Sequence, residues 1–307
     1  MGVISSPNLD HATLLLFEKN FERLAANKDT KLLNCPAIKH MDIKGISNIS
    51  RIEGNDLVNV TSSGRNPAKQ YLTIKNDNRK SVAERFTGTY LVDSYDKAVK
   101  LITDPTGDLF QNLTEAKNRL TDKCIINAAV GSVTVGAPDD AGTTLTAAQD
   151  GVKTIAGTTS FTYTTVISKA ITTFKNQYVD TNGVTLAISA TEEEALRNDE
   201  KYMNALYSNQ NTVDKGTISN ASGFNVITFA GNTQGGTLVD LPILPENEGV
   251  RSNVLLAPKS IAFAVEIGRL DCERSATHVN SWEITIDMWV KAVRLQGSKI
   301  IILTSTM

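Results

Sequence analysis

The stretch DPTGDLFQNLTEAKNRLTDKCIINAAVG, from Asp104 to Gly131, has the most regular pattern in the chain. Its start carries a proline and two acids, which favour a first helical turn, and apolar residues then recur every three or four positions. These apolar positions are Leu109, Leu113, Ala116, Leu120, Cys124 and Ala128. The spacing predicts one helix over 109–130, about 33 Å long at 1.5 Å per residue. The residues expected to pack on the rest of the fold are Leu113, Ala116 and Leu120, and the polar face carries Arg119 and Asp122.

The composition around this helix is that of an ordinary globular protein. Of 307 residues, 41% are hydrophobic and 21% are charged. The formal net charge is −2, so the chain lacks the basic excess with which proteins neutralise nucleic-acid phosphates. Three cysteines without CxxC spacing argue against a disulfide framework and favour a reducing compartment. Since no secretory signal or membrane-spanning apolar run is present, we expect a soluble cytoplasmic product with no membrane partner.

The N-terminal third predicts a helix followed by a long polar excursion. Residues 8–27 have amphipathic helical spacing. Residues 43–52 and 70–75 have β-type composition and are separated by turn-forming residues. A lone hairpin is marginal in water, so this one should lean on another part of the structure. Residues 86–92 read as a strand that leads toward the long helix.

The rest of the chain predicts an α+β fold without the βαβ repetition of a doubly wound sheet. Residues 131–165 read as surface loops with one or two short strands, and helical spacing returns over 165–178. A buried strand over 184–188 leads to Ser189 and Glu192, which have the spacing of a capping box that opens a short helix. A further strand is expected within 223–231.

Three expectations concern the C-terminal quarter. Residues 257–268 resemble a helix with Pro258 in its first turn. Residues 281–290 alternate between apolar and polar as a half-buried strand does, and 299–305 read as a buried strand. These last two strands are expected to pair antiparallel through a turn at 296–298.

The motifs of common enzyme chemistry are missing from the sequence. The three histidines have no other ligand at metal-binding spacing, and no phosphate-binding glycine loop or nucleophile elbow occurs. A carboxylate pair such as Asp93 with Asp96 stays open, because catalytic carboxylates meet through the fold. We therefore assign no catalytic, cofactor-binding or metal residue and expect no enzyme, with an unrecognised non-local active site as the less favoured alternative.

The order of these parts resembles the major capsid proteins of tailed double-stranded DNA bacteriophages, which have the Hong Kong 97-type fold. In one branch of that family, spaced acids precede a helix with a repeating Ala, Arg, Asp and Ile pattern. The corresponding positions here are Val92, Asp93, Asp96 and Asp104, then Ala116, Arg119, Asp122 and Ile125. The later GFNVITF and the closing NSWEITIDMWVKAVRLQGSKIIIL also resemble the family pattern.

The resemblance implies a division of the chain. Residues 1–33 would be an N-terminal arm, and 34–85 the extended hairpin called the E-loop with its base. Residues 86–183 and 260–307 would form the peripheral domain, whose spine helix is the 109–130 helix, and the terminal strands would complete its sheet. Residues 184–259 would form the axial domain. The inter-subunit candidates on the E-loop are Arg51, Arg65 and Lys69, and the polar face of the spine helix would look toward the shell interior or a neighbour.

The resemblance also implies a function. Copies would assemble as hexamers and pentamers into an icosahedral head around double-stranded DNA, contacted without sequence specificity. Portal and scaffolding proteins would be partners, with a possible decoration protein, and the head would be built in the bacterial cytoplasm. An encapsulin-like nanocompartment is the alternative within the same fold. Residues 38–85 hold nine bases against five acids, and 184–260 hold nine acids against five bases. This asymmetry favours a basic loop laid on an acidic region of the next subunit.

Overall fold

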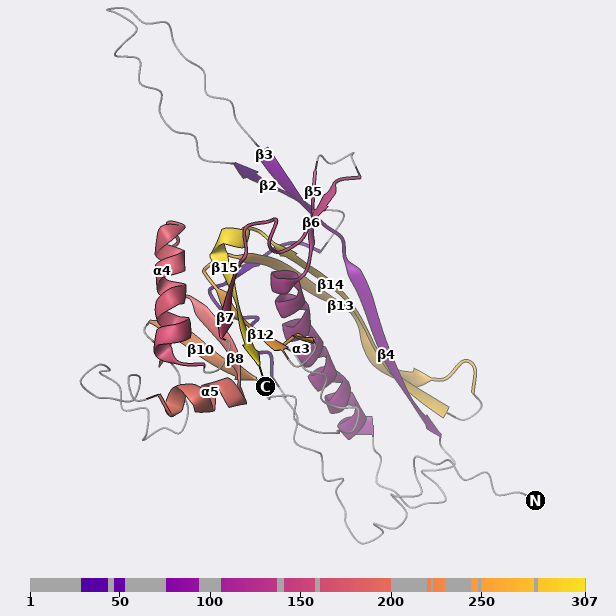
Figure 1. Cartoon of the computed structure of the whole chain (residues 1–307). Helices are drawn as coiled ribbons and strands as arrows, with labels where there is room; N and C mark the ends of the chain where they lie inside the picture. The colour runs from indigo at the N-terminus through magenta and orange to yellow at the C-terminus, as the bar shows by residue number, and fades with distance from the viewer. Residues whose placement is uncertain are drawn as a thin grey trace, which may run out of the picture.

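The computed structural model describes eleven segments of the chain. They are residues 29–43, 47–52, 76–93, 106–136, 141–157, 161–199, 220–221, 223–229, 244–247, 250–278 and 281–306. These segments form three β-sheets together with the helices α3, α4 and α5 (Figure 1). Among the described residues, each helix is too short or too polar to cross a membrane. The expected helix over 8–27 and the expected strand over 70–75 lie outside these segments.

The first sheet has four strands and carries the long helix on one face. Its strand order is β1 (Ile38–His40), β13 (Ile261–Arg274), β14 (Ser281–Arg294) and β4 (Glu84–Asp93). β13, β14 and β4 are antiparallel neighbours, whereas β1 runs parallel to β13. Helix α3 (Thr106–Val130) lies along this sheet in Figure 1 and contacts all three long strands. The helix expected over 109–130 is therefore present and begins three residues earlier.

Helix α3 packs through predicted apolar positions in its first half, whereas near its end the most buried residues lie next to the predicted Cys124 and Ala128. Leu113 is 5% exposed and lies in a small cluster with Val92, Ile284 and Ile286. A Cβ at Gly88 on β4 would lie 3.5 Å from the Leu113 side chain, which is an ordinary van der Waals distance. Near the other end of the helix the fully buried side chains are Ile125, Ile126 and Ala129. The helix therefore contributes to two hydrophobic clusters along its length.

The second sheet has seven strands and is covered on both faces. Its order is β7 (Lys153–Gly157), β15 (Ile300–Thr306), β12 (Val250–Leu256), β8 (Thr185–Ser189), β10 (Phe224–Phe229) and β9 (Asn220–Ala221), with β11 (Glu246–Asn247) beside β12. A π-helical turn over Tyr163–Ile167 precedes α4 (Ser168–Asn176), and α5 (Ala190–Arg197) follows β8. Strands β8 and β10 are parallel neighbours with α5 between them in sequence.

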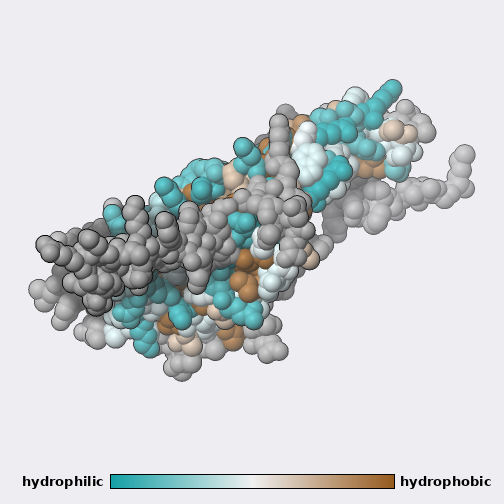
Figure 2. All heavy atoms as spheres, turned by 90° about the horizontal axis from the view of Figure 1, so that it is seen from above, coloured by the Kyte–Doolittle hydropathy of each residue, from teal (hydrophilic) through white to brown (hydrophobic). Residues whose placement is uncertain are grey.

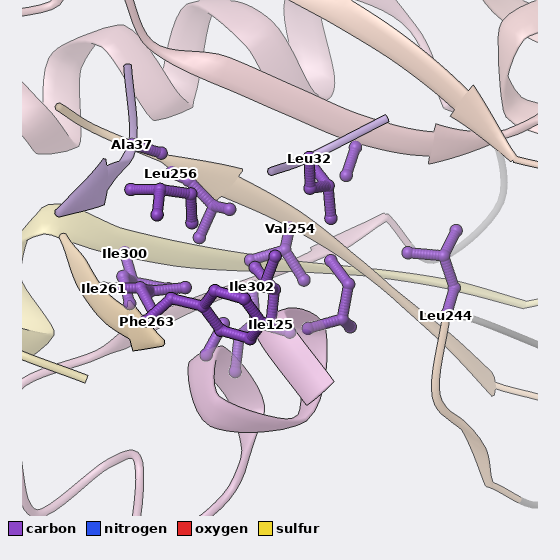
Figure 3. Close-up of a cluster of buried hydrophobic side chains, with 14 of the residues drawn as sticks. Leu32, Ala37, Ile125, Leu244, Val254, Leu256, Ile261, Phe263, Ile300 and Ile302 are labelled. Atoms are coloured by element: carbon purple, nitrogen blue, oxygen red, sulfur yellow. The ribbon is translucent and has the colours of Figure 1, made fainter. Parts of the chain in front are cut away.

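Alternate residues of the central strands enter two separate cores. Val254, Leu256 and Ile302 lie in the main core with Ile125 of α3 and Phe263 of β13, as Figure 3 shows. Leu186, Ile188, Leu255 and Ile301 enter the other core, which includes Phe174 of α4. Because successive side chains of a strand point to opposite faces, the sheet separates the two cores.

The third sheet carries the hairpin that projects from the body in Figure 1. It consists of β2 (Ser47–Ile52), β3 (Asn76–Ser81), β5 (Val133–Val135) and β6 (Thr143–Leu145), each antiparallel to its neighbour. Strand β5 follows α3 after two residues, so the hairpin leans on the end of the long helix. This is the support that a lone polar hairpin requires.

The helix expected over 257–268 is wrong, because this segment contains the start of β13. Ile261, Ala262 and Phe263 are all fully buried, so apolar residues occupy both faces of the strand. A short apolar run of this kind hides the alternation that identifies a strand. Pro258 precedes the strand and does not open a helix.

The expected pairing of the last two strands is also wrong. Strand β14 pairs with β13 and β4, whereas β15 pairs with β12 and β7 in the other sheet. Between them Gly297 packs against the backbone of residue 150, and a Cβ at Gly297 would lie 2.1 Å from the Asp150 carbonyl oxygen. The chain thus changes sheets at this turn. The seven-stranded sheet consequently contains strands from both sides of the expected domain boundaries, which fall after residues 183 and 259.

Candidate assembly surface and its buried anchor

The base of the projecting hairpin is held by one buried carboxylate between two arginines. Asp150 Oδ1 lies 2.5 Å from Arg79 Nη2 of β3, and Asp150 Oδ2 lies 2.7 Å from Arg294 Nε of β14. The three side chains are 1%, 2% and 0% exposed for Arg79, Asp150 and Arg294. We call this group the hairpin anchor. Charge-assisted hydrogen bonds of this kind are short and directional, so they fix the orientation of β3 relative to β14.

The hairpin anchor continues into the end of the long helix. Arg294 Nη1 donates to the carbonyl oxygens of Ala129 and Gly131, at 2.9 and 2.8 Å. Carbonyls at a helix C-terminus carry partial negative charge, which favours a cation there. The Arg294 guanidinium thereby links the hairpin, the four-stranded sheet and α3. Sequence reasoning missed Asp150 and Arg294, because Asp150 lies 71 residues from Arg79 and 144 residues from Arg294 along the chain.

The three expected E-loop contact residues are only partly covered by the structure. The backbone of Arg51 lies in β2, opposite Asp77 of β3. Arg65 and Lys69 lie outside the described residues. The structure therefore places the base of this hairpin and leaves the three side-chain roles as predictions.

The packing residues of α3 differ in how deeply they lie. Leu113 is buried, and Leu120 is half-buried against the main core. Ala116 between them is also half-buried. Arg119, expected on the polar face, has its Nη1 atom buried without a hydrogen-bond partner among the described residues.

Asp122 is not on an outward polar face, which corrects that expectation. It is fully buried, and its carboxylate accepts hydrogen bonds from the backbone N–H groups of Lys31 and Leu32, at 3.0 and 3.1 Å. Burial raises the pKa of the Asp122 carboxyl, and the two N–H donors and the Lys31 charge oppose that rise. The acid faces inward because segment 29–37 crosses α3 at this point and needs partners for its backbone N–H groups.

Segment 29–37 also reaches the other sheet. Lys31 Nζ donates to the Thr228 carbonyl oxygen at 2.6 Å and lies 5.4 Å from the centre of the Phe229 ring. Leu32 and Ala37 are fully buried in the main core. This short segment therefore contacts both α3 and the seven-stranded sheet.

The face of the four-stranded sheet opposite α3 carries a row of ion pairs. Arg85 of β4 binds the Asp287 carboxylate of β14 through Nε at 2.9 Å and Nη2 at 2.5 Å, and its guanidinium lies 5.6 Å from the centre of the Trp289 ring. Arg269 of β13 binds Asp271 at 2.7 Å and also Glu273. We call these residues the outer-face row. The Arg85 guanidinium lowers the pKa of Asp287, with a weaker contribution from Arg269.

A third polar group is buried inside the seven-stranded sheet. Glu192 accepts hydrogen bonds from Ser189 and Ser305, and Arg251 lies 3.4 Å from its carboxylate. Arg251 Nη1 also donates to the Ser189 hydroxyl at 2.6 Å. The predicted capping box is therefore wrong in detail, because the Ser189 side chain makes no cap hydrogen bond to the α5 backbone. Both side chains turn inward to meet the buried arginine.

The described surface offers little that could act as a catalytic or metal site. An open hollow of about 440 Å³ is lined by Thr30, Leu33, Lys117, Asn118, Thr121 and residues 265–267, and the Thr121 hydroxyl donates to the Lys117 backbone carbonyl. In the part of the chain that the structure describes, no group of three or more metal-binding side chains occurs. On the face seen in Figure 2, hydrophobic residues lie in small groups among hydrophilic ones. The geometry is that of a framework with a projecting hairpin.

Comparisons with known proteins agree with this geometry. A family model described as phage capsid protein matches residues 9–306. Similar solved structures include the head of Helicobacter pylori bacteriophage KHP40, which is 11% identical over 99% of this chain and 98% of that chain, with a TM-score of 0.66. The acid-stable capsid of Helicobacter pylori bacteriophage KHP30 is 10% identical over 94% and 95%, with a TM-score of 0.67. The capsid of cyanophage P-SCSP1u is 12% identical over 94% and 92%, with a TM-score of 0.64.

At these identities the likeness to solved structures is one of fold, and the shared fold is the Hong Kong 97 type. A search of curated proteins finds no match. The α+β architecture and the family resemblance expected from the sequence are thus confirmed.

Proposed function

Because this chain belongs to the phage capsid protein family and is a structural major capsid protein, we propose that its copies assemble as hexamers and pentamers into an icosahedral phage head around double-stranded DNA. The observation that carries the proposal is the family match over residues 9–306. The fold supports it, since a rigidly held hairpin projects from a two-sheet body (Figure 1). A strand pair held in this way beside the body suits contacts between copies.

Within this proposal the hairpin is the E-loop and lies across a neighbouring copy. The chain from 38 to 85 has four more bases than acids, and 184–260 has four more acids than bases. Opposite charge of this kind gives orientation and association rate more than affinity. We assign Arg51, Arg65 and Lys69 as hairpin contacts to the next subunit, and the hairpin anchor as the base that holds the hairpin at a defined angle.

The proposed domains follow the two large sheets. The four-stranded sheet with α3 corresponds to the peripheral domain, and the seven-stranded sheet with α4 and α5 corresponds to the axial domain. This grouping moves β7, α4 and β15 from the peripheral to the axial domain relative to the sequence expectation. Residues 1–33 remain the proposed N-terminal arm, and Lys31 and Leu32 at its end are tied to Asp122.

The proposed partners follow from the role of a phage head. Portal and scaffolding proteins take part in assembly in the bacterial cytoplasm, a decoration protein can add to the finished shell, and DNA is contacted without sequence specificity. The near-neutral charge of −2 suits a container whose DNA is neutralised largely by counterions. No cofactor is required for this role.

Negative-stain electron microscopy of the purified full chain tests the proposed function. Closed shells are expected, and the nucleic acid in shells from infected cells should be double-stranded DNA. Shells that contain a cargo enzyme in place of DNA would favour the nanocompartment. A small oligomer that never forms shells would overturn the proposal and favour an unrecognised enzyme.

The role of the hairpin has its own test by charge reversal. The double variant Arg51→Glu with Arg65→Glu should form far fewer shells and change the thermal unfolding of the unassembled chain little, because neither residue belongs to the hairpin anchor. Reversal of two bases outside the hairpin, Lys153→Glu with Lys169→Glu, is the control; both side chains are exposed. Normal shells from the Arg51 and Arg65 variant would contradict the assigned role.

A further inference from the structure

A fully exposed aromatic residue directly follows the C-cap of helix α4 in a strained backbone conformation. Tyr178 is 99% exposed and has a φ of 54°. Among the described residues, only Tyr178 and Lys259 combine a positive φ with a side chain. A bulky residue in this left-handed region is uncommon, because its Cβ crowds the backbone.

The hydrogen bonds around Tyr178 form a helix end that is normally built with glycine. The Val179 N–H donates to the Phe174 carbonyl at 2.9 Å, and the Tyr178 N–H donates to the Lys175 carbonyl at 3.1 Å. Val179 packs against the core that contains Phe174. This arrangement stops the helix and requires a left-handed residue at 178, where glycine avoids the steric cost. A tyrosine there also exposes its ring to water, so it adds nothing to the isolated chain.

The surroundings of Tyr178 are those of a contact residue. The flanking side chains Lys175, Asn176, Asp180 and Asn182 are all exposed and polar. An aromatic side chain inside a polar rim is typical of the energetic centre of a protein interface. The base Lys175 precedes the tyrosine in the chain, and the acid Asp180 follows it.

We propose that Tyr178 is an anchor of the contact between copies of this chain, and that its partner is a second copy. The inference rests on the proposed shell and adds a specific residue and surface to it. A strained, fully exposed tyrosine at this position is explained when the ring is buried only after assembly. The patch contains a carboxylate and only one base, which disfavours DNA as its partner.

Lys259 supplies a matched control for the strain. It also has a φ of 54°, its side chain is exposed, and its N–H donates to the Pro36 carbonyl at 3.0 Å. Replacement of either residue by glycine removes the same backbone strain, but only the Tyr178 change removes the proposed contact. The variants are Tyr178→Gly, Tyr178→Ala and Lys259→Gly in the full chain.

The experiment measures thermal unfolding of the unassembled chain and the yield of shells. Tyr178→Gly should leave the thermal midpoint unchanged or higher, and should lower shell yield by about tenfold or more, as truncation of an interface anchor does. Tyr178→Ala should lower the yield equally. Lys259→Gly should keep the yield of the wild type. Cryo-electron microscopy of wild-type shells should show the Tyr178 ring buried against a neighbouring copy.

Each contrary result has a separate meaning. Wild-type shells in which Tyr178 stays exposed, or is covered by a different protein or by DNA, would overturn the inference alone. Shell yields from both Tyr178 variants equal to wild type would do the same. A wild-type chain that forms no shells would overturn the proposed function, and the inference with it.

Discussion

Two groups of arginines and carboxylates in this molecule have the same chemistry but differ in the exposure of their arginines. In the hairpin anchor, Arg79, Asp150 and Arg294 are at most 2% exposed. In the outer-face row, the Arg85 side chain is 64% exposed and the Arg269 side chain 45%, whereas the Asp287 carboxylate beside Arg85 is only 10% exposed. A buried ion pair adds little net stability but cannot lose one partner, whereas an exposed pair is screened by water and salt. The buried group therefore fixes geometry, and the exposed row remains available for contacts.

The largest effect is expected where a charge is buried with no partner. Leu113→Asp places a carboxylate between α3 and the four-stranded sheet, so the chain should fail to fold, as judged by circular dichroism of the purified protein. Leu113→Ala should cost only about 2–4 kcal/mol of unfolding free energy. Leu120→Asp should cost less than Leu113→Asp, because Leu120 is half-buried. Normal folding of Leu113→Asp would show that this end of the helix does not pack as described.

Removing the shared carboxylate of the hairpin anchor is the next test. Asp150→Ala leaves Arg79 and Arg294 buried without their common partner, so unfolding free energy should fall by about 3–5 kcal/mol in urea titrations. Asp271→Ala, on the exposed row, is the matched control and should change little. A triple variant with Met, Leu and Met at positions 79, 150 and 294 should recover most of the loss. If Asp150→Ala and Asp271→Ala lowered the unfolding free energy equally, the hairpin anchor and the outer-face row would not differ in their contribution to stability.

Asp122 lies between these extremes. Its hydrogen-bond donors are neutral backbone N–H groups, and among the described residues the only charge that stabilises its carboxylate is that of the Lys31 side chain. Asp122→Asn should cost about 1–3 kcal/mol, since one N–H then faces an amide donor. The pKa of Asp122 is raised in the fold, so this carboxyl holds its proton more tightly in the folded chain than in the unfolded chain. The cost of Asp122→Asn should therefore be greatest below about pH 4 and shrink as pH rises through the folded pKa. Urea titrations of both proteins between acid and neutral pH measure this trend, and a cost that grows with pH would contradict it.

The smallest effect is expected on the outer-face row. Arg85→Ala should lower the urea midpoint of the unassembled chain less than Asp150→Ala does, because the Arg85 guanidinium is largely solvated and Asp287, which is 10% exposed, keeps the nearby charge of Arg269. The same comparison at high salt should remove any residual difference. If Arg85→Ala lowered the unfolding free energy as much as Asp150→Ala, the exposure of an arginine would be a poor guide to how much its ion pair stabilises the fold.

Local patterns in the sequence were sufficient to predict an element when one of its faces is buried and the other is exposed. The 3–4 spacing of Leu109, Leu113 and Leu120 predicted α3, and strict alternation over 281–290 predicted β14. The patterns failed where both faces are buried, as at Ile261–Phe263, where an apolar run resembles a helix as much as a strand. Asp122 was misplaced because helical spacing cannot show that another segment crosses the polar side of the helix. Asp150 could not be found at all, since its role exists only after distant residues meet.

The sequence distances within the hairpin anchor have a consequence for the order of folding. Asp150 lies 71 residues after Arg79 and 144 residues before Arg294. Contacts of long sequence separation form late, because closing the intervening loops costs entropy. A growing chain on the ribosome thus cannot complete the hairpin anchor until residue 294 has been made and β14 has joined its sheet. The projecting element reaches its final angle only in a chain whose body is already folded, which delays contact with other copies until the subunit is ready.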